Sequence, residues 1–233
     1  MEELETLVLN RLKKEARRSN VDWLPHYDPE LIRSINQSTL LNGPSGCGKS
    51  HLAARIIGKC LPESTAWCFG PMITKDPAFK NLQKEMTKKK CKLLDSHKIN
   101  QPIDIAEITG NKINVLLVDD PDAMEPENLK WISDLSTKSL YAGRKFGIVN
   151  FQIVHDAFAR KGAIKASTNE CSKCILYPQI AKHVATKFMK NRLNMGKEVI
   201  DKIYAFLGKA DRWMCLVNSY PCCVLTSSGC MLL

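Results

Sequence analysis

The sequence lacks a long hydrophobic run. No apolar stretch approaches the roughly 18 to 20 residues that a membrane-spanning helix needs. The first eighteen residues alternate acidic and basic groups, which is too charged a pattern for a secretory signal. We therefore expect an intracellular protein without a membrane partner.

A regular cysteine framework is also missing, although the chain has ten cysteines in 233 residues. In a domain of this size without a signal peptide, we expect reduced thiols rather than disulfides. Cys171 and Cys174 have the C-x-x-C spacing of a zinc ligand pair, but no second C-x-x-C or H-x-x-x-H pair accompanies them. Zinc is therefore the less favoured interpretation. Cys222 and Cys223 lie in an apolar run and are predicted to be core residues.

Internal repeats and low-complexity tracts are absent as well. With 44% hydrophobic and 25% charged residues, the composition is that of an ordinary globular protein, and the length suits one sizeable α/β domain. We predict an N-terminal segment at 1–37, with an amphipathic helix over 1–18 and an irregular connection containing a short helix near 30–35. Residues 38–233 are predicted to form the domain.

The most informative feature that is present is a glycine-rich octapeptide, GPSGCGKS, which fits the pattern G-x-x-x-x-G-K-[ST] at every fixed position. Small residues let successive backbone N–H groups surround a phosphate, and a following helix directs its positive end at the same anion. The apolar run 38–41 predicts a strand before the loop, and residues 50–59 have helical spacing after it. The predicted ATP-binding residues are Gly43, Pro44, Ser45, Gly46, Cys47, Gly48, Lys49, Ser50 and His51.

Three side chains of this loop have individual expectations. Lys49 adds a full positive charge beside the phosphates, and Ser50 offers a hydroxyl to Mg²⁺. Cys47 lies at a helix N-terminus, so we expect an acidified, reactive thiol that ATP protects from alkylation.

A second motif, Asn114–Asp120 (NVLLVDD), predicts an apolar strand that ends in two carboxylates. We expect Asp119 to help hold Mg²⁺ and Asp120 to orient or deprotonate water. Together with the phosphate loop, this strand predicts the carboxyl edge of one parallel sheet, where open α/β folds bind ligands. A third strand over 147–154 ends at His155, which could contact the γ-phosphate or the attacking water, or could serve structure only.

The remaining elements complete an α/β prediction. The expected fold is a phosphate-loop NTPase sandwich of three layers with a central, mostly parallel sheet, of the RecA-like or ASCE type. Further helices are predicted over 75–98, 125–140, 180–193 and 197–207. Further strands are predicted over 65–69, 174–177, 213–217 and 222–226.

The net charge of +10 is uneven, because residues 160–212 contain twelve Lys or Arg and only four Asp or Glu. Such an excess suggests a polyanionic partner, although a solvated surface explains it equally well by itself. If the partner is DNA, this segment and Lys88–Lys90 are the predicted contacts with backbone phosphates, largely independent of sequence.

The order of these features resembles the DNA-packaging ATPases of large eukaryotic DNA viruses, virophages and Polinton-like elements, a branch of the FtsK–HerA translocases. The resemblance covers about residues 38–233 and includes the loop and the VLLVDD strand. Its more specific markers are Gly143-Arg144-Lys145, Thr168-Asn169-Glu170 before CILYP, and the closing WMCLVNSYPCCVL segment.

This resemblance implies a homo-oligomeric ring that hydrolyses ATP with Mg²⁺ and drives double-stranded DNA into a capsid, in contact with capsid or portal components. It implies that Arg144 acts on the nucleotide of a neighbouring subunit, although an ordinary exposed arginine is an equal alternative. It also implies a location in an infected host cell, at an assembly site in the nucleus or cytoplasm, or in the virion.

Two other functions remain open at this stage. A nucleotide or small-molecule kinase uses the same loop, but an arginine-rich lid is not evident in the sequence. A nucleotide-switched encapsidation protein, which recognises DNA with little turnover, also fits, since adenoviral packaging proteins share this loop type.

Overall fold

The computed structural model describes residues 38–87, 89–108, 113–158, 168–218, 222–227 and 229–233. The predicted N-terminal helix and connection at 1–37 lie outside the described residues, so they stay predictions. Within the described ranges, no helix is both long enough and apolar enough to cross a bilayer.

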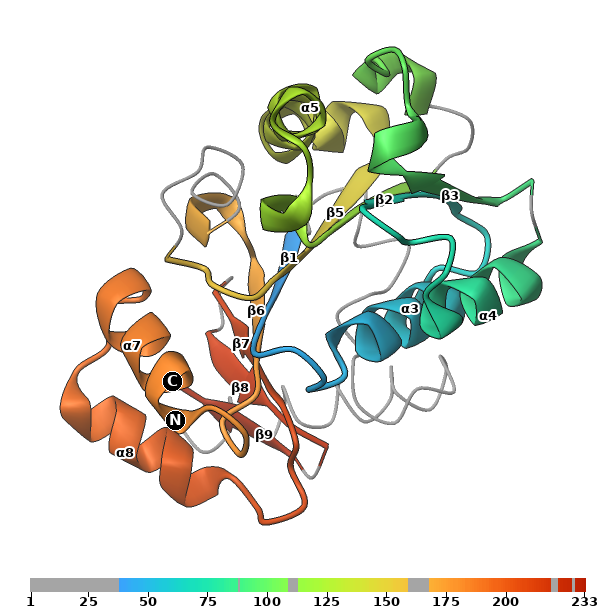
Figure 1. Cartoon of the computed structure of the whole chain (residues 1–233). Helices are drawn as coiled ribbons and strands as arrows, with labels where there is room; N and C mark the ends of the chain where they lie inside the picture. Colours follow the sequence, from blue (N-terminus) through green and yellow to red (C-terminus); the bar gives the residue numbers. More distant parts are fainter. Residues whose placement is uncertain (1–37, 88, 109–112, 159–167, 219–221, 228) are drawn as a thin grey trace.

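A single nine-stranded sheet organises the domain, in the order β3-β2-β4-β5-β1-β6-β7-β8-β9 (Figure 1). In this order, neighbouring strands from β3 through β6 pair in parallel. The three remaining pairings, β6–β7, β7–β8 and β8–β9, are antiparallel. The bounds are β1 Ser38–Asn42, β2 Thr65–Gly70, β3 Cys91–Asp95, β4 Asn114–Asp119, β5 Ile148–Val154, β6 Lys173–Leu176, β7 Met214–Val217, β8 Cys223–Leu225 and β9 Cys230–Leu232.

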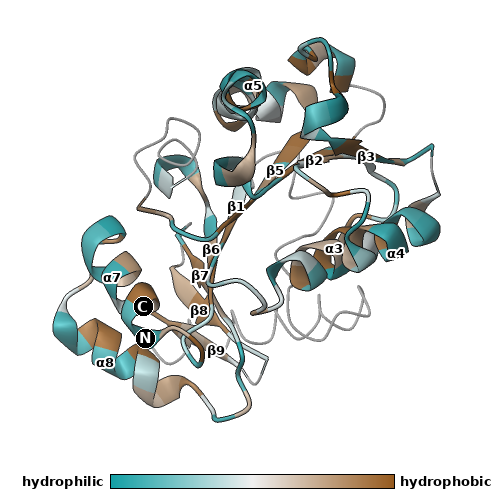
Figure 2. Ribbon diagram, in the orientation of Figure 1, coloured by the Kyte–Doolittle hydropathy of each residue, from teal (hydrophilic) through white to brown (hydrophobic). Residues whose placement is uncertain are grey.

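Helices cover both faces of this sheet and bury its central strands (Figure 1). On one face lie α3 (Lys49–Cys60) and α4 (Pro77–Met86), which pack on residues such as Leu117 and Phe151. On the other face lie α5 (Pro126–Ala142), α7 (Lys182–Arg192) and α8 (Lys197–Phe206). The apolar strands and the polar outer faces of the helices are visible in Figure 2. This confirms the predicted three-layer α/β fold with a mostly parallel sheet.

The position of β5 specifies the class more closely. It lies between β1, which leads into the phosphate loop, and β4, which carries the acidic residues. An extra strand inserted between these two is the arrangement of the predicted RecA-like, ASCE class. Two polar pairs fix α5 on this central strand: Asn150 donates to Ser139, and Gln152 donates to Ser136. All four side chains are buried, so each bond offsets the cost of removing its donor and acceptor from water.

The predicted helix over 75–98 is wrong in its second half. Helix α4 ends at Met86, Thr87 has a left-handed φ of 71°, and the chain then enters β3. The lysine-rich sequence hid a strand at the edge of the sheet, where Lys92 is exposed and only one neighbouring strand pairs. Edge strands tolerate such charges, which also discourage pairing with other chains.

Candidate nucleotide site

Three parallel strand ends meet at one edge of the sheet. Asn42 at the end of β1 pairs with Val154 of β5, and Ile153 pairs with Asp119 at the end of β4. Backbone hydrogen bonds continue beyond the strands, from Gly43 N to the Val154 carbonyl (3.3 Å) and from Asp120 N to the Ile153 carbonyl (3.1 Å). The sheet therefore brings the loop, both carboxylates and His155 together, as the sequence predicted.

The glycines of the loop are required by its backbone. Gly46 and Gly48 have φ of 74° and 98°, in the left-handed region that favours glycine. A Cβ on Gly43 would lie 2.8 Å from Cδ2 of Tyr177 and 3.0 Å from Sγ of Cys47. Helix α3 begins directly after Gly48, and among the described residues no side chain caps it. This geometry offers the first-turn N–H groups, including those near Ser50, to an anion.

Lys49 is held against its own loop. Its Nζ donates to the carbonyl oxygens of Gly43 (2.7 Å) and Pro44 (2.9 Å) and lies 3.3 Å from Nδ1 of His155. An ammonium has three donors, so these contacts use all of them. The side chain is only 6% exposed, and this burial lowers the pKa of Lys49, against the opposing fields of Cys47, Asp120 and Asp119.

His155 joins this lysine to the second carboxylate. Its Nε2 lies 2.9 Å from Oδ2 and 2.8 Å from Oδ1 of Asp120. The hydrogen-bond network assigns the neutral tautomer with the proton on Nε2, since Nδ1 then accepts from Lys49 and Nε2 donates to Asp120. Asp120 has a left-handed backbone (φ 46°, ψ 58°), which aspartate tolerates better than most residues. The sequence placed His155 at this edge but did not reveal that it links Lys49 with Asp120.

Asp119 is partly buried beside other charged groups. Burial, then the charges of Asp120 and Asp76, raise the pKa of Asp119 to about 7, and Lys49 opposes the shift. A cation bound at this carboxylate would compete with the proton. Ser50, in the first turn of α3, is the other predicted ligand.

These two oxygen ligands fit Mg²⁺. In the described part of the chain, no group of three or more His, Cys, Asp or Glu side chains could hold a metal. Mg²⁺ does not need such a cage, because it binds through one or two protein oxygens and completes its shell with water and phosphate oxygens. Cys171 and Cys174 are buried with their Sγ atoms 3.1 Å apart, so within the same ranges the zinc interpretation gains no further ligand.

The expectation that the Cys47 thiol is acidified is wrong. The thiol is 3% exposed, and burial raises its pKa above the usual value, although the nearby charge of Lys49 acts in the opposite direction. Desolvation therefore outweighs the effect of the helix N-terminus at this position. The prediction for the cysteine pair near the C-terminus is half right, since Cys223 is buried and Cys222 is exposed.

Arg144 does not join the other predicted site residues. It lies in the 3₁₀ turn Gly143–Phe146, just before the start of β5, whereas His155 follows the end of that strand. Seven residues of strand span about 20 Å, far beyond the reach of an arginine side chain. The sheet thus separates Arg144 from the nucleotide site of its own chain.

The basic residues that were predicted to contact DNA lie in different parts of the fold. Lys89 and Lys90 precede β3 and lie at the same edge as Arg144, and Lys88 is outside the described residues. Within 160–212, Lys173 is 2% exposed inside β6, where burial lowers its pKa to about 8. It cannot belong to a DNA-binding surface. The cations of α7, by contrast, are mostly exposed.

One residue of the site escaped the sequence analysis. Tyr177 follows β6, and its ring packs directly over Gly43. The sequence contains no signal for this contact, because it depends on β6 pairing with β1 from more than 130 residues away.

Comparison with known proteins identifies no family. No protein-family model matches the chain, and no curated protein matches it. Solved structures with a similar backbone include the monomer form of the pCW3 conjugation coupling protein TcpA with ATPγS (17% identity, 79% of this chain, 58% of that chain, TM-score 0.48). A DnaB-like replicative helicase is also similar (9% identity, 82% of this chain, 56% of that chain, TM-score 0.46). So is the cytoplasmic domain of the Thermomonospora curvata Type VII secretion ATPase EccC (13% identity, 81% of this chain, 25% of that chain, TM-score 0.45).

The chain spans less than two thirds of the length of each of these structures. At these identities and scores, the similarity assigns no residue a role.

Proposed function

We propose that this protein is an ATP-hydrolysing motor that moves double-stranded DNA, and that it packages a viral genome. The observation that carries the hydrolytic part is the meeting of the phosphate loop with Asp119, Asp120 and His155 at one sheet edge. This edge contains a group for each requirement of phosphoryl transfer to water: phosphate binding, metal binding and a carboxylate base.

Binding of ATP begins with an exchange of partners at Lys49. The ammonium leaves the carbonyls of Gly43 and Pro44 and turns to the β- and γ-phosphates, while the amides of the loop and of the first turn of α3 donate to the same oxygens. Ser50 and Asp119 would hold Mg²⁺, which when bound neutralises charge on the phosphate oxygens.

Asp120 acts as the base in this proposal. Its carboxylate accepts a proton from the attacking water as the water oxygen bonds to the γ-phosphorus, and the bond to the ADP oxygen breaks with its electron pair leaving on ADP. His155 donates to this carboxylate and so fixes its orientation. Correct placement matters, because a displacement of about 1 Å can cost on the order of 100-fold in rate.

An oligomeric ring would bring an arginine of a neighbouring copy to the nucleotide site. Arg144 lies near the amino ends of the parallel strands, and the nucleotide site lies at their carboxyl ends. An Arg144 that acts on a neighbouring copy therefore requires a head-to-tail contact between copies. Such heterologous contacts close into rings when the rotation between copies permits. In the transition state, a guanidinium at that place would stabilise the charge on the γ-phosphoryl oxygens.

The viral assignment is supported by the resemblance of the sequence to packaging ATPases. Under this proposal the ring works in an infected cell on a capsid or its portal, and its DNA contacts neutralise backbone phosphates without reading bases.

ATPase activity with and without duplex DNA tests this function. Wild-type protein should hydrolyse ATP faster when DNA is added, and Lys49→Ala should lose at least 100-fold. Lys59→Ala, an exposed lysine at the other end of the same helix, serves as the control and should behave as wild type. Absence of stimulation by DNA contradicts the motor, and a mass measurement that finds only monomer with ATP and DNA contradicts the ring.

A nucleotide-switched DNA-binding protein is the second candidate. Because His155 contacts both Lys49 and Asp120, phosphate binding at Lys49 alters the surroundings of Asp120 without any need for hydrolysis. Preference for one DNA sequence far above random DNA, together with negligible turnover, would favour this function over the motor.

A further inference from the structure

Helix α7 carries positive charge without any negative charge. Its sequence, KHVATKFMKNR, contains three lysines, one arginine and one histidine and no acidic residue. At 100° per residue, its buried residues Ala185, Phe188 and Met189 occupy one half of the helix. Lys182, Lys187 and Lys190 occupy the other half and are exposed.

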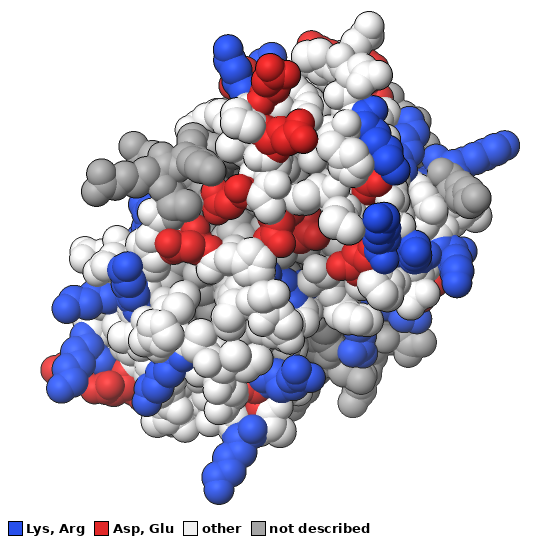
Figure 3. Space-filling view, viewed as in Figure 1, with Lys and Arg blue, Asp and Glu red and all other residues white. Residues whose placement is uncertain are grey.

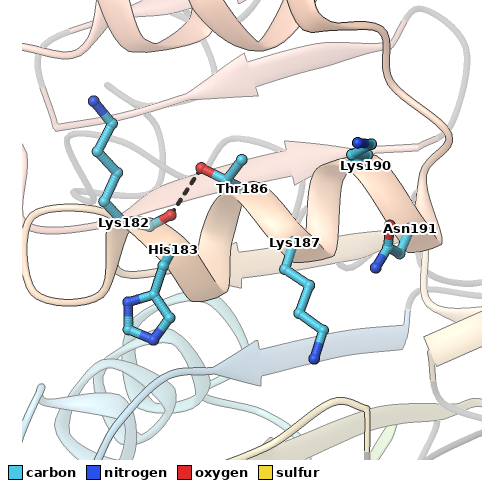
Figure 4. A pocket seen from close by; sticks show the side chains of 6 residues that line it. All are labelled: Lys182, His183, Thr186, Lys187, Lys190 and Asn191. Atoms are coloured by element: carbon cyan, nitrogen blue, oxygen red, sulfur yellow. Dashed lines mark hydrogen bonds between the residues drawn. The ribbon is translucent and has the colours of Figure 1, made fainter.

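The exposed half of α7 borders an open hollow of about 690 Å³. Lysine, histidine, threonine and asparagine side chains line it, and all of them come from this helix (Figure 4). The lining residues are Lys182, His183, Thr186, Lys187, Lys190 and Asn191. In Figure 3, Lys and Arg side chains spread over the lower left of the molecule, where Figure 1 places α7 and α8.

Two lysines elsewhere on the described surface are paired with carboxylates. Lys90 pairs with Glu63 (2.9 Å), and Lys98 pairs with Asp95 (3.0 Å). Among the residues that the structure describes, the three lysines of α7 form no ion pair with a carboxylate.

Aromatic rings hold two of the α7 lysines instead. Lys182 Nζ lies 4.6 Å from the ring centroid of Tyr204, and Lys187 Nζ lies 4.3 Å from that of Phe158. A ring attracts an ammonium without neutralising its charge, so both cations are positioned while their donors stay available to an anion.

The α7 surface is connected to the nucleotide site through Tyr177. Its ring packs over Gly43 of the phosphate loop. Its carbonyl accepts hydrogen bonds from the amides of Ile180 (3.1 Å) and Ala181 (3.0 Å), at the beginning of α7. Tyr177 therefore contacts both the phosphate loop and the start of α7, so a movement of the loop would be transmitted to the helix through this residue.

We propose that the exposed half of α7 is the surface that binds the backbone phosphates of duplex DNA, an inference that rests on the proposed function. From His183 to Lys190 this face extends about 10 Å along the helix, enough for two or three phosphates of one strand. The ammonium groups supply point charges, and the exposed side-chain amide of Asn191 supplies a hydrogen bond to a phosphate oxygen. Such contacts are independent of sequence.

Salt-dependent DNA binding tests this surface. The probe is a duplex of about 30 base pairs and random sequence, and its affinity is measured without nucleotide at several salt concentrations between about 50 and 200 mM. For the combined variant Lys182→Gln, Lys187→Gln and Lys190→Gln, we expect affinity to fall about 10- to 100-fold and the slope of log K against log salt to be shallower by about 2 to 3. The matched control removes three other exposed lysines, Lys197→Gln, Lys202→Gln and Lys209→Gln, and should change the affinity less than about threefold.

Several results would overturn the proposal. One is a wild-type affinity and slope in the α7 variant, with its fold verified by circular dichroism. Another is an equal loss of DNA affinity in the control variant, which would show that the effect depends on the overall charge and not on α7. A third is competition by polyglutamate as effective as that by DNA of equal charge, which would assign the surface to an acidic protein segment.

ATPase measurements keep this proposal distinct from the motor. If wild type binds DNA through α7 but DNA does not accelerate hydrolysis, the motor fails and the α7 surface stands. If DNA accelerates hydrolysis equally in wild type and the α7 variant, the motor stands and the α7 surface fails.

Discussion

Nε2 of His155 lies 2.9 Å from a carboxylate oxygen of Asp120, while the other ring nitrogen faces the ammonium of Lys49 at 3.3 Å. One imidazole therefore contacts both the group that binds phosphate and the group that activates water. Because the ring is neutral in this arrangement, its donor and acceptor are both used.

Replacement of His155 should affect turnover more than binding. We expect His155→Ala to lower kcat about 10- to 100-fold, since Asp120 loses the donor that orients it, and to change the affinity for ATP only a few-fold. His155→Gln should recover part of the loss, because an amide can donate to Asp120 and accept from Lys49. His97→Ala, an exposed histidine bonded to the Pro71 carbonyl, is the control. An unchanged kcat in His155→Ala would exclude a positioning role.

Asp119 should make stability depend on pH when metal is chelated. Its folded pKa of about 7 is raised above the unfolded value of 3.8, so the folded state holds the proton more tightly. Stability from this group is therefore present below about pH 4 and is lost as pH rises to about 7.

Chemical denaturation in EDTA measures the effect. Asp119→Asn should equal wild type near pH 4 and exceed it by about 1 to 2 kcal/mol at pH 8, a figure reduced from the full shift for partial exposure to solvent. Asp134→Asn, an exposed position on α5, should follow wild type at both pH values. Mg²⁺ should stabilise wild type and not Asp119→Asn. A constant difference between the two proteins across this pH range would contradict the assignment.

Gly43→Ala should disturb the loop through a steric conflict with Tyr177. The new methyl group would lie 2.8 Å from a ring carbon of Tyr177 and 3.0 Å from the sulfur of Cys47. We expect a loss of about 1 to 3 kcal/mol in unfolding free energy and weaker ATP binding. In the background Tyr177→Leu, the same change should cost less, and equal costs in both backgrounds would show that the conflict lies elsewhere.

Cys47 should react slowly with iodoacetamide. Burial raises the pKa of this thiol, whereas Cys222 is exposed, so mass spectrometry should find Cys222 alkylated well before Cys47. Saturating Mg-ATP should slow the reaction at Cys47 and leave Cys222 unchanged. Faster labelling of Cys47 than of Cys222, or no protection by Mg-ATP, would contradict the described loop.

The sequence predicted those features that local chemistry determines. The octapeptide and the apolar strand before Asp119 each carry a strong pattern, and their meeting follows from parallel strands that end at one edge. β3 escaped prediction because its lysine-rich sequence has no clear alternation, and β9 because three residues are too few to show a period.

Side-chain contacts over long sequence distances could not be predicted. The contact of His155 with Lys49 joins residues 106 positions apart, and that with Asp120 spans 35. Likewise, the depth of Cys47 depends on packing in the buried core around it, including Tyr177, so the sequence showed the helix N-terminus but not the desolvation that outweighs it.

The length of β5 has a consequence for kinetics. Because that strand separates Arg144 from the nucleotide site of its own chain, any help this arginine gives to hydrolysis must come from another copy. Turnover per chain would then rise with protein concentration and fall on dilution. A small excess of Arg144→Ala chains would likewise slow wild-type partners in mixed assemblies.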